Sequence, residues 1–158
     1  MNSLELLQEM QEARWCGINH FAVYDSSLHT PWELIILKNL PSIKISLESF
    51  KDAMLKIENQ ELAKNILTSL LHEDMAYGVE VMPLEKARIL TSKFFSLFSS
   101  QALCFSNSTW NKNEYAVPAK DFELGLSSWT SLTELTFDSG IIICDNSKIG
   151  IIWFSDDD

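Results

Sequence analysis

Residues 137–158 read FDSGIIICDNSKIGIIWFSDDD, and this stretch decides the fold class of the chain. Two apolar runs, 141–144 and 149–154, flank the polar residues 145–148. Short apolar runs on both sides of a four-residue polar stretch are typical of a β-hairpin. Because isoleucines fill consecutive positions in both runs, we expect both faces of the hairpin to be covered. Trp153 lies inside the second run and is predicted to be largely buried.

The first hundred residues carry helical patterns. Apolar residues recur at three- and four-residue steps after the polar residues Ser3, Ser46 and Asn59, which are suitable helix caps. Two further helices are predicted to begin at prolines, which favour the first helical position. The expected helices cover residues 3–14, 32–40, 46–57, 59–71 and 83–99, while residues 15–24 fit either a strand or a helical extension.

Strand patterns dominate after residue 99. Residues 101–105 and 122–126 are predicted strands, 106–114 a polar loop containing Trp110, and 132–137 an ambiguous segment before the hairpin. Helices followed by strands indicate an α+β fold with N-terminal helices packed on a C-terminal antiparallel sheet that contains the 141–154 hairpin. A chain of 158 residues without a Gly-, Ser- or Pro-rich linker is expected to form one domain, residues 1–158.

The charge is strongly acidic and uneven. The net charge is −10, and residues 113–158 hold nine acids but only two lysines. This balance argues against binding to nucleic acid or to an anionic membrane surface, since both need Lys and Arg. It favours a basic protein partner, although general solubility is the plainer explanation.

Features of the chain favour the cytoplasm. The first fifteen residues contain Glu5, Glu9 and Glu12 and lack the basic and apolar regions of a secretory signal. No apolar run approaches the ~20 residues that cross a bilayer. The three cysteines are odd in number and lie among apolar or aromatic neighbours, as buried free thiols do in a reducing compartment.

Motifs for catalysis are missing from the sequence. It contains no Gly-rich phosphate loop, no Gly-x-Ser-x-Gly elbow and no Cys-x-x-Cys or His-Glu-x-x-His pair. We therefore predict no cofactor, no metal and no catalytic residue. Two alternatives stay open: a Cys16–His20 dyad, if that segment is helical, and a Ca²⁺ or Mg²⁺ site formed by Asp156, Asp157 and Asp158 with Asp145.

Acids and tryptophans near the C-terminus are the candidate partner-binding residues. An aromatic ring beside carboxylates is typical of a protein interface, because the ring supplies desolvated area and the acids supply orientation. Two of the five tryptophans lie among Ser, Thr and Asn. The predicted contact residues are Asp145, Asp156, Asp157, Asp158, Trp110 and Trp129.

Residues 135–158 also resemble the ending of small acidic bacterial immunity proteins. These are the inhibitors encoded beside secreted or contact-dependent antibacterial toxins. The resemblance rests on a strand with a Gly–apolar–Trp core that closes on an acid run, which Ser155 interrupts. It implies a cytoplasmic inhibitor, not an enzyme, whose partner is a cognate basic toxin such as a nuclease. A small cytosolic enzyme with a dispersed active site and an acidic regulatory binding protein are the alternatives.

Overall fold

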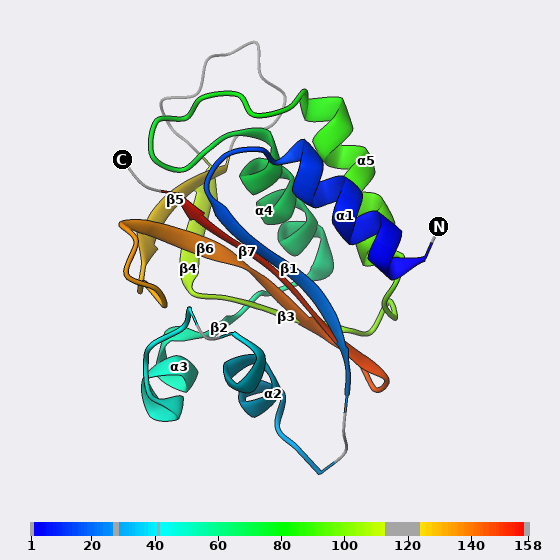
Figure 1. Cartoon of the computed structure of the whole chain (residues 1–158), viewed down its shortest axis with the longest axis vertical. Helices are drawn as coiled ribbons and strands as arrows, with labels where there is room; N and C mark the ends of the chain where they lie inside the picture. The colour runs from blue at the N-terminus through cyan, green and yellow to red at the C-terminus, as the bar shows by residue number, and fades with distance from the viewer. Residues whose placement is uncertain (1, 27–28, 41, 113–123, 157–158) are drawn as a thin grey trace.

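The computed structural model describes residues 2–26, 29–40, 42–112 and 124–156. Its centre is a five-stranded antiparallel sheet with the order β1-β7-β6-β3-β2, beside a two-stranded sheet of β4 and β5 (Figure 1). The helices are α1 (Ser3–Ala13), α2 (Trp32–Asn39), α3 (Leu47–Ala53), α4 (Gln60–His72) and α5 (Leu84–Phe95). The strands are β1 (Ile18–Asp25), β2 (Leu55–Lys56), β3 (Leu103–Ser106), β4 (Ser108–Lys112), β5 (Leu124–Trp129), β6 (Phe137–Cys144) and β7 (Lys148–Asp156).

The predicted hairpin is confirmed and forms the middle of the sheet. Strands β6 and β7 pair from Phe137↔Asp156 to Cys144↔Ile149, so the hairpin is longer than the two apolar runs. The amide of Asp145 donates to the Lys148 carbonyl at 3.0 Å and closes the turn. Trp153 is only 3 % exposed, as predicted.

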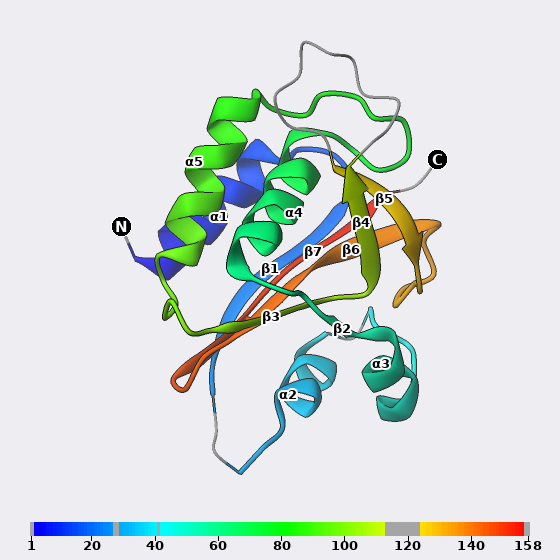
Figure 2. The same ribbon diagram turned by 180° about the vertical axis from the view of Figure 1, so that it is seen from behind.

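Helices cover both faces of this sheet, which explains the consecutive isoleucines. In Figures 1 and 2, α1, α4 and α5 lie on one side of the strands, and α2 and α3 lie on the other. Alternate residues of a strand point to opposite faces. Ile152 and Phe154 accordingly pack in the core beneath α1, α4 and α5, while Ile151 and Trp153 pack in the core beneath α2 and α3.

Local sequence sets most of the helix ends. The side chains of Ser46 and Asn59 accept hydrogen bonds from the Ser49 and Leu62 amides, so both predicted caps are confirmed. The cap of α1 is Asn2, one residue before the predicted Ser3. Helix α3 ends at Ala53, four residues earlier than expected, because the chain turns there into β2, which pairs with β3.

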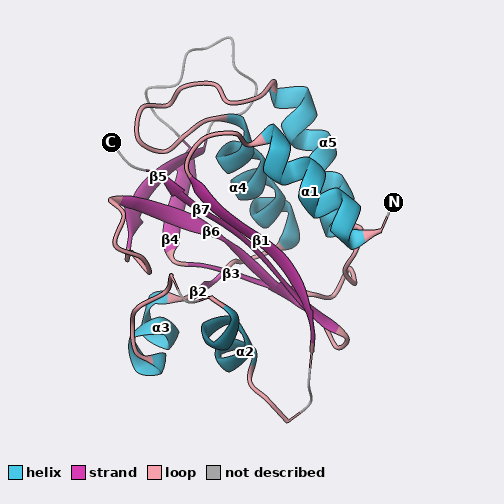
Figure 3. Cartoon of the chain, in the orientation of Figure 1, coloured by secondary structure: helices cyan, strands magenta, loops and turns pink. Residues whose placement is uncertain are grey.

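Two further segments form strands: the first was open between a strand and a helix, and the second was predicted to be a loop. Residues of the ambiguous stretch 15–24 form β1, an edge strand that pairs with β7 along its whole length (Figure 3). The predicted polar loop 106–114 contains β4, and pairing with β5 provides hydrogen-bond partners for the backbone of β4. The sheet thus recruits β1 and β2 from the helical part of the chain, although five helices precede residue 100 as predicted. Among the residues described, no helix is both long and apolar enough to cross a bilayer.

Candidate functional site

Asp156 is an internal residue, not the surface carboxylate that the sequence predicted. It is 3 % exposed, and its two oxygens accept hydrogen bonds from the Arg14 guanidinium at 2.7 Å and 2.8 Å. The Met75 amide donates to the same carboxylate at 2.9 Å. Asp156 lies on the face of β7 that α1, α4 and α5 cover. An unpaired charge there would be costly, and the buried Arg14 neutralises the carboxylate. We therefore remove Asp156 from the predicted contact surface.

Asp145 lies at the other end of β7 and organises the hairpin turn. Its side chain accepts hydrogen bonds from the amides of Ser147, Lys148 and Ser99. At ~3.3 Å per residue, β7 separates its two ends by about 26 Å. The fold therefore does not bring Asp145 together with Asp156, and a shared cation site on the two is excluded. Asp157 and Asp158 lie outside the described residues.

The two predicted tryptophan anchors make internal contacts. Trp129 stacks on Phe137 with ring centroids 5.3 Å apart, and its indole nitrogen donates to the Thr136 carbonyl. Trp110 packs against the core beneath α1, α4 and α5. Both rings are partly buried, so neither is a freely presented anchor.

Cys16 and His20 do not form a catalytic dyad. Burial is the main cause that raises the pKa of Cys16, which is the opposite of what a nucleophilic thiol needs. His20 lies on β1, not on a helix, and its Nε2 is 3.1 Å from the Tyr24 hydroxyl. Within the described ranges, no three His, Cys, Asp or Glu side chains come together as a metal site.

The Asp156 carboxylate instead joins two surface segments, residues 14–17 and 73–82. Arg14 belongs to the first segment and also donates through Nε to the Leu70 carbonyl at the end of α4. Gly17 adopts φ +74°, and a Cβ atom at this position would collide with Asp156 Oδ1. Met75 belongs to the second segment. Both segments are therefore held in place by one buried ion pair at the end of β7.

Exposed aromatic and acidic side chains gather on these two segments. Trp15 is 70 % exposed and Tyr77 is 69 % exposed, although both are large and partly apolar. The Trp15 indole nitrogen donates to the Val81 carbonyl at 3.2 Å, which attaches the first segment to the second. We call the five residues Trp15, Glu73, Tyr77, Val79 and Glu80 the acidic–aromatic surface.

Two glutamates face each other in this surface. Glu73 and Glu80 form an isolated antiparallel β-bridge, which places their side chains directly opposite one another. Like charges in that position repel. His72 is the nearest described base, with ring nitrogens 3.6 Å from Glu73 and 3.9 Å from Glu80. Residues 65–85 contain four acids and no Lys or Arg, so this stretch of the sequence carries an excess of negative charge.

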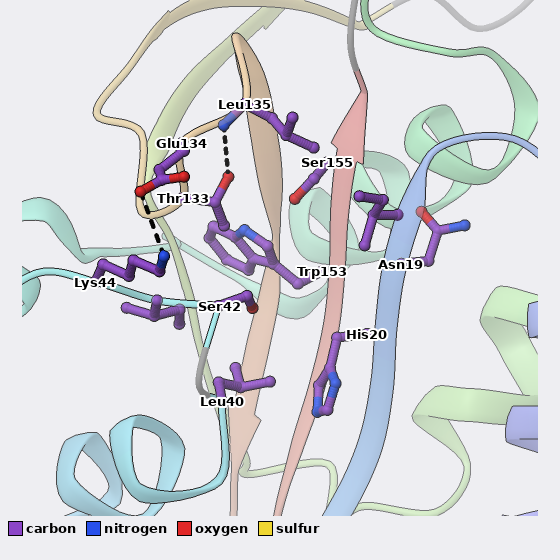
Figure 4. Close-up of a pocket in the computed structure, with 12 residues that line it drawn as sticks. Asn19, His20, Leu40, Ser42, Lys44, Thr133, Glu134, Leu135, Trp153 and Ser155 are labelled. Atoms are coloured by element: carbon purple, nitrogen blue, oxygen red, sulfur yellow. Dashed lines mark hydrogen bonds and ion pairs between the residues drawn. The ribbon is translucent and has the colours of Figure 1, made fainter.

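A separate cavity lies on the face of the sheet that carries α2 and α3. Its floor is formed by β1 and β7, and its sides by Leu40 and residues 42–44 and 133–135 (Figure 4). Lys44 and Glu134 close one side with an ion pair of 3.3 Å. The lining residues are Ile18, Asn19, His20, Leu40, Ser42, Ile43, Lys44, Thr133, Glu134, Leu135, Trp153 and Ser155.

Comparison of the chain with protein-family models, curated proteins and solved structures finds no match. Sequence reasoning did not identify Trp15 or Tyr77, because nothing in their local patterns separates an exposed ring from a core ring. One signal was present for the ion pair: Arg14 is the only Lys or Arg before Lys38.

Proposed function

We propose that this protein is a cytoplasmic immunity protein that binds and neutralises a basic antibacterial toxin, and that it is not an enzyme. The observation that carries this proposal is the acidic–aromatic surface. Trp15 and Tyr77 supply ring area that partner binding would desolvate, and Glu73 and Glu80 supply charge beside it. Aromatic anchors surrounded by charged residues are typical of tight protein interfaces.

Charge complementarity supports a basic partner. The chain carries a net charge of −10, which accelerates the encounter with a positively charged protein. A Lys or Arg of the partner placed between Glu73 and Glu80 would relieve their repulsion. Toxins that cleave nucleic acids are basic because they bind phosphates, so a nuclease fits this requirement. The resemblance of residues 135–158 to immunity proteins points in the same direction.

The proposed contact surface differs from the one expected from sequence. Asp145, Asp156, Trp110 and Trp129 have internal roles, and we do not retain them. Asp157 and Asp158 stay in the proposal, because they follow the residue that anchors the acidic–aromatic surface.

The decisive experiment uses the product of the reading frame adjacent to the gene of this protein. That product should arrest growth when expressed alone in bacteria, and co-expression of this protein should restore growth. Purified wild-type protein should bind it, with an affinity that falls as salt rises. Trp15→Ala or Tyr77→Ala should weaken binding by about 30-fold, mainly through faster dissociation.

A matched pair of variants separates surface charge from total charge. Glu73→Gln/Glu80→Gln should slow association and reduce its salt dependence. Glu48→Gln/Asp52→Asn removes the same charge from exposed positions on α3, across the sheet, and should change association much less. Equal effects of the two double variants would disprove the contact surface, and a harmless adjacent product that does not bind would disprove the function.

A further inference from the structure

The cavity beside α2 and α3 has the dimensions of a small-molecule site. Its volume is about 310 Å³, at the lower end of the roughly 300–1,000 Å³ that ligand pockets occupy. The two sides are joined twice, by the Lys44–Glu134 ion pair and by a hydrogen bond from the Lys44 amide to the Leu132 carbonyl. None of the five residues of the acidic–aromatic surface lines it. The cavity is therefore a feature separate from the proposed toxin contact.

The described residues of the lining carry no net charge. Among the lining residues that the structure describes, only Lys44 and Glu134 carry full charges, and they pair with each other at 3.3 Å. Burial lowers the pKa of His20, which keeps its imidazole neutral near pH 7. The remaining walls are aliphatic side chains, the Trp153 indole and small polar groups. A ligand with a full charge would lose its hydration there without gaining an unpaired counter-ion.

Ser155 supplies a neutral polar group at the floor of the cavity. The residue is only 5 % exposed and lines the cavity together with Trp153, whose indole nitrogen is buried without a hydrogen-bond partner among the described residues. Figure 4 shows the Ser155 hydroxyl on the cavity side of β7, with Trp153 between it and His20. A buried donor such as the Trp153 indole nitrogen almost always has a partner, and a ligand hydroxyl, which both donates and accepts, could bond to it and to the Ser155 hydroxyl. Ser155, which interrupts the acidic ending of the chain, thus places a neutral polar group where β7 faces the cavity.

We propose that this cavity binds an uncharged small molecule with a compact apolar body and one hydroxyl group, which forms a hydrogen bond with Ser155. The apolar body contacts Trp153, Leu40 and Ile43. The class includes simple phenols and alcohols. Ser155 is the specificity-determining residue, because it distinguishes such a molecule from a hydrocarbon of the same shape.

Three probes of matched shape test the proposal: 4-methylphenol, toluene and 4-methylbenzoate, which is an anion at neutral pH. Titrations are followed through the backbone amide signals of the ¹⁵N-labelled protein. We expect 4-methylphenol to give saturable shifts at residues 18–20, 133–135 and 153–155. Toluene should bind roughly threefold to tenfold more weakly, the value of one neutral hydrogen bond. The benzoate should bind more weakly still.

Three variants give the test its specificity. Ser155→Ala should remove the preference for 4-methylphenol over toluene while leaving toluene binding unchanged, and Ser100→Ala, an exposed serine outside the cavity lining, should change neither. Ser42→Trp, at an exposed position on the rim, should block both probes. The proposal is overturned if shifts fail to saturate, if they persist in Ser42→Trp, or if the preference survives in Ser155→Ala.

Discussion

Arg14 and Asp156 stand 142 residues apart in the sequence and form a buried two-point ion pair, with nitrogen–oxygen distances of 2.7 Å and 2.8 Å. The Arg14 guanidinium also lies 4.8 Å from the centre of the Phe154 ring. The pair connects the end of α1 with the last residue of β7, so it fastens the first element of the chain to the last. Its geometry also positions the two segments of the acidic–aromatic surface.

Breaking this pair from one side should destabilise the protein strongly. Asp156→Asn leaves the Arg14 guanidinium buried without a counter-charge, and we expect a loss of about 3–5 kcal/mol in the free energy of unfolding, measured with urea. Glu134→Gln breaks the exposed pair with Lys44 and should cost at most about 1 kcal/mol. Similar losses in the two variants would contradict the buried, fully paired geometry of Asp156.

Replacing Trp153 should lower the stability of the fold far more than replacing the exposed Trp15. Trp153→Ala removes a ring that packs beneath α2 and α3 and should cost roughly 3–5 kcal/mol in a thermal or urea melt. Trp15→Ala, at a position that is 70 % exposed, serves as the control and should cost less than about 1 kcal/mol. An unchanged melt for Trp153→Ala would place its ring outside the core.

The hairpin turn should make stability depend on acid pH through Asp145. Burial opposes ionisation of this carboxyl, but hydrogen bonds from the amides of Ser147, Ser99 and Lys148 outweigh it and lower the pKa to about 2. A folded-state pKa below the ordinary value of 3.8 means that the stabilisation is complete only above about pH 5. It is lost as the pH falls towards 2.

The stability gap between wild type and Asp145→Asn should therefore stay constant from neutral pH to about pH 5 and narrow as the pH falls towards 2. Urea unfolding at a series of pH values measures it. Asn146→Ala, an exposed position in the same turn, should follow the wild-type pH profile. A gap that widens in acid would reverse the sign of the predicted pKa shift.

Gly140 should tolerate a side chain less well than Gly150. A Cβ at Gly140 would meet backbone atoms of β7, the Ile152 carbonyl and the Trp153 Cα, which cannot move without breaking the hairpin register. A Cβ at Gly150 would meet the tips of the Phe98 and Phe94 side chains. Gly150→Ala should cost about 1–3 kcal/mol and Gly140→Ala more, measured by urea unfolding. The reverse order would show that the strands separate easily at Gly140.

The elements predicted well are those whose signals are local. The caps Ser46 and Asn59 sit next to the helices they begin, and the apolar runs of the hairpin sit next to their turn. Strand β1 was ambiguous because its residues acquire a strand partner only from β7, more than 120 positions away. Strand β4 was missed because its polar residues pair with β5 across a long connection, and polar composition alone resembles a loop.

The sequence by itself determined the α+β class, the central hairpin, the burial of Trp153 and the excess of negative charge, because each follows from composition or short-range pattern. Only the tertiary structure decided which acids reach the surface. Neighbouring strand residues point to opposite faces, so Ser155 faces the cavity while Asp156 faces Arg14. The apolar run 149–154 before these two residues does not alternate between apolar and polar residues, so the sequence does not show which residues point to which face. The packing of helices on each side makes that assignment, and it turns a predicted surface carboxylate into an internal anchor.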